Sequence, residues 1–340
     1  MFQWKRAGGY GKQNKSDCIE MTSFPYVDAH CHLSTDRIVS HGFGYSNSDS
    51  FNYVEYRDVL RCVMSNNQFD LMKVKKIRNN SMLIRSFGIH PWYSHLFTLK
   101  DDIGKLEHYR EVLQWKDEQE FQKLVEALPP PLKLQQYIDD NFNANEFDVI
   151  GEIGLDKLFR LPDNGFYTSV DTGRLTRTQV KISHQVNVFH AMLQLSKQYQ
   201  LPISVHDVKC HQVLFESVYD ILGDQDAINI CLHSYTGSVE MLGHFWFKKF
   251  NQNRVFLSFS GFINFSNSAT AMPLLQSIPK ESILTETDFP IDLQTEQELQ
   301  LEIKKVYNGI REILQFESED ALRALVYNNT QRFLKRDVEQ

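Results

Sequence analysis

Short runs of apolar residues, separated by longer polar or amphipathic stretches, recur along the chain from residue 24 onward. Runs of this length that are bounded by turn-forming residues are typical of strands, and continuous apolar runs are typical of strands buried on both faces. The pattern predicts eight strands, at residues 24–33, 58–65, 81–92, 147–156, 201–207, 226–237, 254–261 and 282–290.

The intervals between these strands carry helical periodicity. Residues 185–200 place Val186, Phe189 and Leu193 close to one face of a helix, and residues 67–79 predict another helix. Strands that alternate with helices favour parallel β/α units, and eight such units close naturally into a barrel. We therefore expect an α/β protein with a TIM-type (β/α)8 barrel, and an open doubly wound sheet is the alternative.

Two segments depart from this repeat. Residues 1–23 are polar, contain glycine and show no periodicity, which is typical of a disordered tail. Residues 92–146 are polar and contain a proline triplet at 129–131, so we expect an enlarged connection between the third and fourth strands, with one or two helices. The predicted organisation is a disordered tail at 1–23 and one barrel domain at 24–340, in which 92–146 resembles an insertion.

Composition and charge narrow the class of protein. Hydrophobic residues make up 42% and charged residues 23%, as in an ordinary soluble globular protein. The formal net charge of -7 argues against bulk attraction to nucleic acid or an anionic membrane, although bound metal ions would invert the sign of the charge locally. No apolar run reaches the ~18 residues of a transmembrane helix, and the first residues lack the apolar core of a secretory signal.

The cysteines bear on the compartment. There are five, they are scattered, and they form no CxxC pair. This usage predicts neither a disulfide framework nor a cysteine zinc site, and it fits a protein of the cytoplasm, the nucleus or both.

Side chains that can bind metal ions recur at the carboxyl ends of five predicted strands. They are His30, His32, Glu152, His206, His233 and Asp288. His30 and His32 alternate along the first strand, so both point to the same side. Glu152 lies in an apolar strand, where a carboxylate is rarely buried unless it is paired or binds a cation. Asp288 follows Glu286 by two residues, and paired carboxylates are costly unless a cation neutralises them.

The repeated placement favours a metal site, because active sites of β/α barrels form at this end of the strands. Taken singly, each histidine is more often a core residue with a backbone partner, and Glu152 could pair with an Arg or a Lys. Imidazoles mixed with carboxylates suit zinc, manganese or iron, and accept magnesium less readily. Two ions ~3.5–4 Å apart could share Glu152 as a bridge and convert a water into a nucleophile near neutral pH.

Six motifs in order resemble those of the TatD-type metal-dependent deoxyribonucleases, which belong to the amidohydrolase superfamily of barrels. They are VDAHCHL, FGIHPW, IGEIGLD, LPISVH, CLHSYTGS and LTETDFP, and the resemblance covers roughly residues 24–335. The run GLDKLFR is similar to a eukaryotic, fungal-like branch of the family. The resemblance implies 3′→5′ exonuclease action on DNA by a metal-activated water.

The resemblance also implies roles for individual residues. His30, His32 and Asp288 would hold one divalent ion, His206 and His233 would hold a second, and Glu152 would bridge them; the ions would be Mg, Mn or Zn. Asp288 and Glu152 would be the catalytic carboxylates, and His90 would lie near the substrate.

The sequence departs from the family on the substrate side. The fifth-strand histidine is usually followed by a small residue and an arginine, whereas Asp207 and Val208 stand here, and the loop after Asp288 lacks the usual arginine. Lys157 and Arg160, after the fourth strand, are candidates to bind substrate in their place, or else are solvated surface charges.

Three functions therefore follow as hypotheses. The first is a phosphodiesterase that acts on DNA or another phosphodiester, and the second is a small-molecule amide or ester hydrolase, because fold and ligands do not fix the substrate. The third is a protein-binding scaffold with reduced catalysis, whose partner would bind residues 92–146. No membrane partner is expected.

Overall fold

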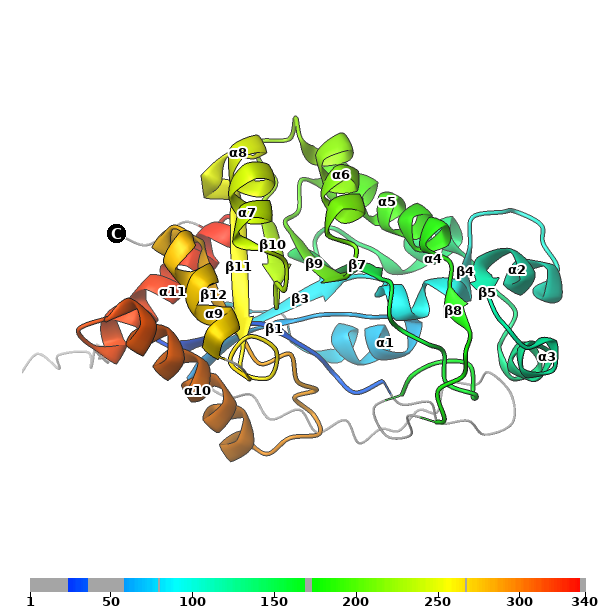
Figure 1. The fold of residues 1–340 in the computed structure, drawn as a ribbon, viewed down its shortest axis with the longest axis horizontal. Helices are drawn as coiled ribbons and strands as arrows, with labels where there is room; N and C mark the ends of the chain where they lie inside the picture. Colours follow the sequence, from blue (N-terminus) through cyan, green and yellow to red (C-terminus); the bar gives the residue numbers. More distant parts are fainter. Residues whose placement is uncertain (1–23, 36–57, 79, 169–172, 267, 337–340) are drawn as a thin grey trace, which may run out of the picture.

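The chain forms a barrel of parallel strands in the computed structural model, which describes residues 24–35, 58–78, 80–168, 173–266 and 268–336 (Figure 1). Eight strands follow one another around the sheet in the order of the sequence. They are β1 (Tyr26–Cys31), β2 (Val59–Val63), β3 (Leu83–Phe87), β7 (Val149–Asp156), β9 (Ile203–Val208), β10 (Ile230–His233), β11 (Val255–Ser260) and β12 (Ile283–Glu286). The predicted (β/α)8 barrel is confirmed, and the alternative of an open doubly wound sheet is wrong.

All eight strands are shorter than the runs that predicted them, and two of them, β10 and β12, end beside residues with left-handed backbone. Ser234 directly follows β10 and Asp288 lies two residues beyond β12, and their φ angles are 41° and 61°. These angles belong to the left-handed region and not to extended backbone, so both strands end near the positions where chemically active side chains stand.

The two ends of the sheet meet at β1 and β12. The amide of Asp288 donates to the carbonyl of His30 at 3.0 Å, and the amide of His32 donates to the carbonyl of Phe289 at 2.9 Å. The Thr285 hydroxyl also donates to the carbonyl of Val27 at 2.6 Å. This nearly closed barrel brings the carboxyl ends of the first and last strands together.

Helices cover the outside of the barrel. They include α1 (Gln68–Lys76), α5 (Ile182–Tyr199), α6 (His211–Leu222), α7 (Val239–Met241), α8 (Phe247–Lys249), α9 (Ser268–Ser277), α10 (Glu296–Leu314) and α11 (Glu319–Phe333), with a π-helical turn (Leu242–Trp246) between α7 and α8. The helix predicted at 67–79 is α1, whose start is fixed by a capping box between Asn67 and Asp70. None of the described helices is long and apolar enough to span a membrane.

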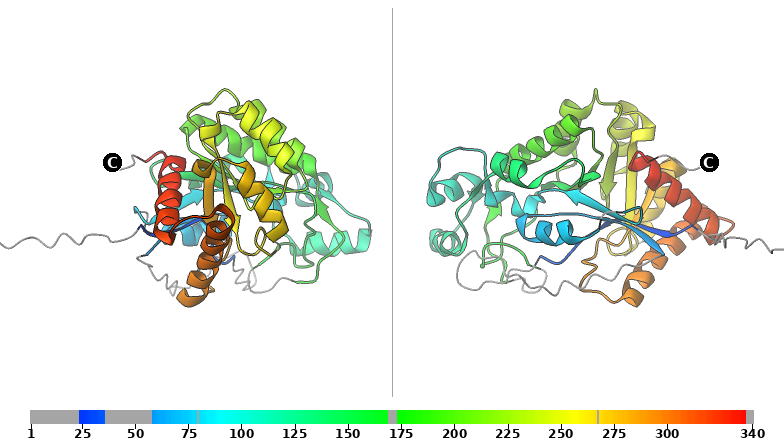
Figure 2. Two further views of the ribbon diagram at one scale, coloured as in Figure 1. Left: turned by 60° about the vertical axis from the view of Figure 1, so that its left-hand side comes forward. Right: turned by 180° about the vertical axis from the view of Figure 1, so that it is seen from behind.

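The last two helices pack beside the point where the barrel closes. Figure 2 shows α10 and α11, in orange and red, on the flank of the molecule that carries β1 and β12. The hydroxyl of Tyr307, on α10, accepts a hydrogen bond from the amide of Val27 at 3.1 Å, and the Asn329 side chain, on α11, donates to the carbonyl of Ile283 at 2.8 Å.

The enlarged connection between β3 and β7 contains a 3-10 turn (Pro91–Leu96) and three α-helices, which is more than the one or two expected. The helices are α2 (Lys105–Val112), α3 (Glu118–Ala127) and α4 (Leu134–Asn141); the short strands β4 (Phe97–Thr98), β5 (Leu113–Gln114) and β6 (Leu132–Lys133) lie among them, and β8 (Gln179–Val180) pairs with β5. Helices α2 and α3 lie at the end of the molecule opposite α10 and α11 (Figures 1 and 2). The predicted tail at residues 1–23 lies outside the described residues.

Strands β7 and β9 approach each other closely at Gly154. Its φ angle is 149°, and a Cβ atom added there would lie 2.0 Å from the carbonyl oxygen of His206. Only glycine fits both this conformation and this spacing. Gly154 therefore lets the two central strands pair where Glu152 and His206 face each other.

Candidate metal centre

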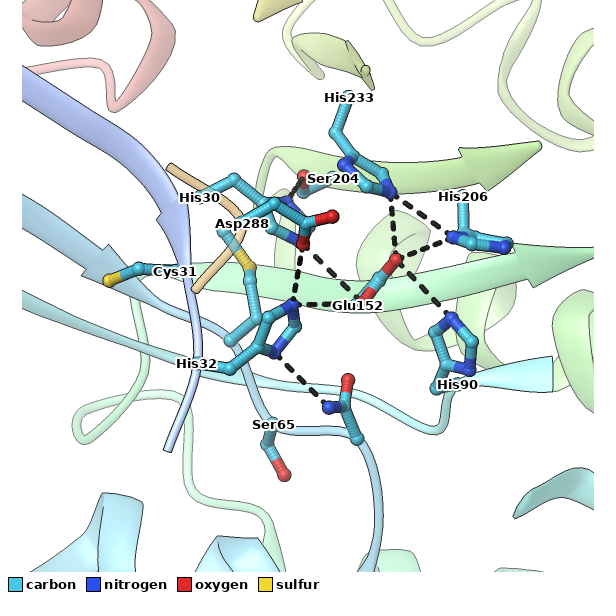
Figure 3. A network of polar contacts seen from close by, with 12 residues as sticks. His30, Cys31, His32, Ser65, His90, Glu152, Ser204, His206, His233 and Asp288 are labelled. Carbon is cyan, nitrogen blue, oxygen red and sulfur yellow. Dashed lines mark hydrogen bonds and ion pairs between the residues drawn. The ribbon is translucent and has the colours of Figure 1, made fainter. Parts of the chain in front are cut away.

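All six residues predicted as metal ligands lie together at the carboxyl ends of the strands (Figure 3). Four stand in strands: His30 in β1, Glu152 in β7, His206 in β9 and His233 in β10. The other two stand just beyond strand ends: His32 after β1 and Asp288 after β12. Because the strands are parallel and the barrel is nearly closed, residues far apart in sequence meet here.

Glu152 lies at the middle of the cluster, and its two oxygens face different partners. Its Oε1 is 2.8 Å from His206 Nδ1 and 2.8 Å from His233 Nε2. Its Oε2 is 3.5 Å from His30 Nε2 and 3.4 Å from His32 Nε2. Such a carboxylate can bridge two cations, one on each oxygen.

The side chain of Glu152 is kept ionised by its neighbours. Burial alone would raise its pKa, but the surrounding imidazoles, first among them His90, His233 and His30, hold that pKa well below its usual range. The cluster is therefore built around a buried negative charge.

Asp288 lies on the Oε2 side of Glu152. Its Oδ1 is 3.1 Å from His32 Nε2 and 3.9 Å from His30 Nε2. Burial opposes ionisation of Asp288, but the hydrogen bond from His32 and the nearby imidazoles lower its pKa. His30, His32 and Asp288 thus offer two nitrogens and one oxygen that converge within 4.8 Å of one another.

Each of the four histidines proposed as ligands has a second ring nitrogen, which points away from Glu152. This second nitrogen lies against a further polar group. His30 Nδ1 lies 2.8 Å from Ser204 Oγ, His32 Nδ1 3.1 Å from Asn66 Nδ2, His206 Nε2 3.6 Å from Asp156 Oδ2, and His233 Nδ1 3.4 Å from Glu286 Oε1. In the sequence, Glu286 stands out as a carboxylate two residues before Asp288, whereas Asn66, Asp156 and Ser204 were not predicted. Asp156 could have been found, because period-two alternation along β7 puts it on the same side as Glu152.

His90 joins the cluster from the turn after β3. Its Nε2 lies 3.4 Å from Glu152 Oε1, and its Nδ1 accepts a hydrogen bond from the amide of Trp92 at 3.2 Å. Burial, partly opposed by the charge of Glu152, lowers the pKa of His90 to about 4, so the ring is neutral. A neutral imidazole that accepts at Nδ1 carries its proton on Nε2. In this tautomer His90 points a donor at the centre, and its ring is also one of three groups, with Glu152 and His206, whose ligand atoms lie within 4.8 Å of one another.

Lys157 and Arg160 lie on the loop directly after β7, and both are exposed. In the described part of the chain, neither takes part in the hydrogen bonds or ion pairs that join the cluster. Between them, Phe159 stacks on Trp92 with ring centroids 4.4 Å apart. This loop thus adds an aromatic surface and two free-standing cations at the end of the barrel that carries the centre.

The buried atoms at the centre fit divalent metal ions. Among the described residues, His30 Nε2 is buried without a hydrogen-bond partner, although it points at two carboxylates. A buried polar atom without a partner is costly, and a cation between it and the carboxylates removes that cost. The nitrogen and oxygen donors suit manganese or zinc and also admit magnesium.

Comparison with known proteins connects this centre to a family. A family model described as TatD related DNase matches residues 27–335. A Saccharomyces cerevisiae protein described as an uncharacterized deoxyribonuclease is 44% identical over 321 residues, which cover 91% of this chain and 99% of that protein. The Cut9-interacting protein scn1 of Schizosaccharomyces pombe is 29% identical over 293 residues, which cover 74% of this chain and 84% of that protein.

Solved structures show the same fold at low sequence identity. The crystal structure of a TatD family hydrolase from Entamoeba histolytica superposes with a TM-score of 0.57 and 15% identity, covering 92% of this chain and 98% of that one.

Proposed function

Because this chain belongs to the TatD related DNase family and is a metal-dependent hydrolase, we propose that it cleaves phosphodiester bonds in DNA with two divalent ions at Glu152. The observation that supports the proposal is that the two carboxylate oxygens of Glu152 contact different histidines: Oε1 faces one set of imidazoles and Oε2 faces another. A single buried carboxylate shared in this way is what a bridging ligand requires.

The proposal assigns the ligands by side. On the Oε2 side, His30, His32 and Asp288 hold one ion, and on the Oε1 side His206 and His233 hold the other. The ions would polarise a phosphoryl oxygen and lower the pKa of water.

Asp288 is proposed as the proton acceptor. Its side chain is 30% exposed, whereas that of Glu152 is 3% exposed, so Asp288 can reach both the centre and incoming water. The lowered pKa of Asp288 keeps it ionised at neutral pH, as a base must be. The buried Glu152 is not accessible to incoming water, so its proposed role is to bridge the two ions.

The substrate would lie over the carboxyl ends of β3 and β7. The Nε2 proton of His90 points into the centre, where it can donate to a phosphoryl oxygen. Lys157 and Arg160 are exposed at the same end and can attract the phosphates that follow along a strand. Because Asp207 stands where the family usually has a small residue ahead of an arginine, we expect modest activity, biased toward short or single-stranded 3′ ends.

The test is release of nucleotides from end-labelled single-stranded DNA with Mg²⁺ or Mn²⁺. Asp288→Asn keeps the size of the side chain but removes its charge and basicity, and it should lower the rate about a hundredfold or more. The matched control is Asp292→Asn, because Asp292 contacts Ser34 and Lys73 and lies outside the cluster. Equal rates for wild type and Asp288→Asn would mean that the nuclease is a contaminant.

A wild-type protein that releases no nucleotide with any of these ions would contradict the phosphodiesterase. Hydrolysis of small esters or amides, lost in Asp288→Asn, would then identify the small-molecule alternative. The Schizosaccharomyces pombe relative is named for its interaction with Cut9, which favours one second candidate function, binding of a protein partner through residues 92–146. If a metal-loaded protein shows neither nucleotide release nor hydrolysis of small esters or amides, binding of a protein partner is the function that remains.

A further inference from the structure

The two halves of the centre differ in the groups that stand behind the histidines. Behind His30 and His32, on the Oε2 side of Glu152, stand the uncharged side chains of Ser204 and Asn66. Behind His206 and His233, on the Oε1 side, stand the carboxylates of Asp156 and Glu286. A partner of this kind decides which ring nitrogen carries the proton and how basic the other one is.

The carboxylate of Asp156 has one oxygen left for His206. Its Oδ1 accepts from the amides of Leu158 at 2.7 Å and Phe159 at 3.0 Å, which fixes the turn after β7. Its Oδ2 accepts from the indole of Trp92 at 2.6 Å and lies 3.6 Å from His206 Nε2. An ionised carboxylate only accepts, so it favours a proton on Nε2; when a cation is bound, the lone pair of Nδ1, the atom that faces Glu152, is then left for the cation.

Glu286 does the same for His233 from inside the barrel. It is fully buried, and the hydroxyls of Ser234 and Ser258 donate to its two oxygens. Its Oε1 also lies 3.4 Å from His233 Nδ1. Without a cation, His233 Nε2 donates to Glu152 Oε1 at 2.8 Å. When a cation takes that place, the proton of His233 belongs on Nδ1, facing Glu286, and the lone pair of Nε2 is left for the cation.

Charge gives these partners a second role. The ion position on the Oε2 side has a carboxylate of its own, Asp288, whereas the Oε1 side shares Glu152 and otherwise offers only imidazoles. We infer that Asp156 and Glu286 are positioning residues which hold His206 and His233 in their metal-binding tautomers and supply the missing negative charge to that ion position. The inference rests on the proposed two-ion centre.

Asp156→Asn is the sharpest variant, because the amide cannot satisfy all partners. If its oxygen keeps the turn, its NH₂ group replaces Oδ2 and faces two donors, the Trp92 indole and His206 Nε2–H. His206 can then pair only by moving its proton to Nδ1, which removes the lone pair from the centre, the tautomer error known from Asp→Asn changes behind catalytic histidines. Glu286→Gln makes the corresponding change at His233.

The experiment counts ions by equilibrium dialysis of the purified full chain against Mn²⁺. The wild type should bind two ions. Asp156→Asn and Glu286→Gln should each retain one ion, with affinity for the second lowered about 10-fold to 100-fold, the usual effect of losing a partner behind a ligand. A thermal melt of each metal-free variant checks that it is folded. If one of the two variants is unfolded, the ion count of the other variant tests the inference.

Asp207→Asn is the matched control. Asp207 is adjacent to His206 and carries the same charge as Asp156, but it accepts from His211 Nδ1 at 2.6 Å and from the amide of Cys210 at 3.1 Å. This control should bind two ions with wild-type affinity. Wild-type affinity in both Asp156→Asn and Glu286→Gln would overturn the inference and leave the two-ion centre standing. A wild type that binds fewer than two ions would overturn both.

Discussion

At the scale of single residues, the centre depends on which atom of each imidazole faces Glu152 and whether that atom carries a proton. His30, His206 and His233 each present a ring nitrogen to the carboxylate, and so does His90. Distance alone makes His90 look like a further ligand. The hydrogen bond from the Trp92 amide to its Nδ1 separates it from the others, because it fixes the proton on Nε2.

His90→Ala should therefore leave the metal content at two ions per chain. It should lower nuclease activity about a hundredfold, the usual cost of removing a preorganised donor from a transition state. Metal analysis by atomic emission and the nucleotide-release assay, run on the same preparations, check both parts. Glu152→Ala is the comparison, because loss of a bridge weakens both ion positions. Loss of an ion in His90→Ala would show that His90 is a ligand.

The residues of the centre were predictable to different degrees. All six proposed ligands lie at strand ends, where alternation and burial make a polar side chain conspicuous, and they do converge. Asn66 gave no such signal, because it lies in the loop after β2 and meets His32 only through the fold. The proton position of His90 depends on a backbone contact made by the turn after β3, which no sequence pattern encodes.

At the scale of elements, the pairing of β7 with β9 places Gly154 opposite His206, two residues beyond Glu152, and Gly154 sets the spacing of the two strands. An alanine at 154 would place its Cβ 2.0 Å from the carbonyl oxygen of His206 in a backbone conformation that favours glycine. One strand would have to move.

Gly154→Ala should destabilise the protein by about 3 kcal/mol or more and lower Tm by roughly 6 °C or more. Differential scanning calorimetry of the metal-free protein measures this directly. Gly104→Ala is the control, because a Cβ at Gly104 meets nothing within 4 Å. A Gly154→Ala protein that melts with the wild type would show that the strands are not held at this spacing.

The enlarged connection is tied to the barrel by buried histidines. Nε2 of His95 bonds the carbonyl of Gly165 at 3.0 Å, and Nε2 of His184, at the start of α5, bonds the carbonyl of Ser94 at 3.0 Å. Burial lowers the pKa of His95 to about 3 and that of His184 to about 4, so both rings are neutral when folded.

These histidines predict loss of stability in acid. The unfolded chain takes up protons near pH 6.5 and the folded chain near pH 4 or below, so their contribution is complete above about pH 6.5 and is lost as the pH falls toward 4. His184→Gln keeps a donor for Ser94 but does not titrate. It should remove about 2 kcal/mol of the stability lost between pH 7 and pH 5. Urea unfolding at both pH values in EDTA measures the difference, and an unchanged loss would contradict the neutral, buried state.

At the scale of the whole molecule, the eight strands and their order were predictable, because each strand stands in the sequence as a short apolar run between polar or amphipathic stretches. The ends of β10 and β12 were not, since they depend on the left-handed backbone at Ser234 and Asp288. The interior of residues 92–146 was underestimated, because α2, α3 and α4 are short helices in polar sequence that gain stability by packing. The site could be placed because a parallel barrel gathers all its strand ends at one face.

The central claim is that this face holds two divalent ions on either side of one carboxylate. Anomalous diffraction from crystals grown with Mn²⁺ tests it most directly, because it locates each ion without reference to activity. We predict two peaks ~3.5–4 Å apart, one within bonding distance of Glu152 Oε2 and Asp288, the other of Glu152 Oε1 and His206 Nδ1. A single peak, or peaks that do not share Glu152, would contradict the account.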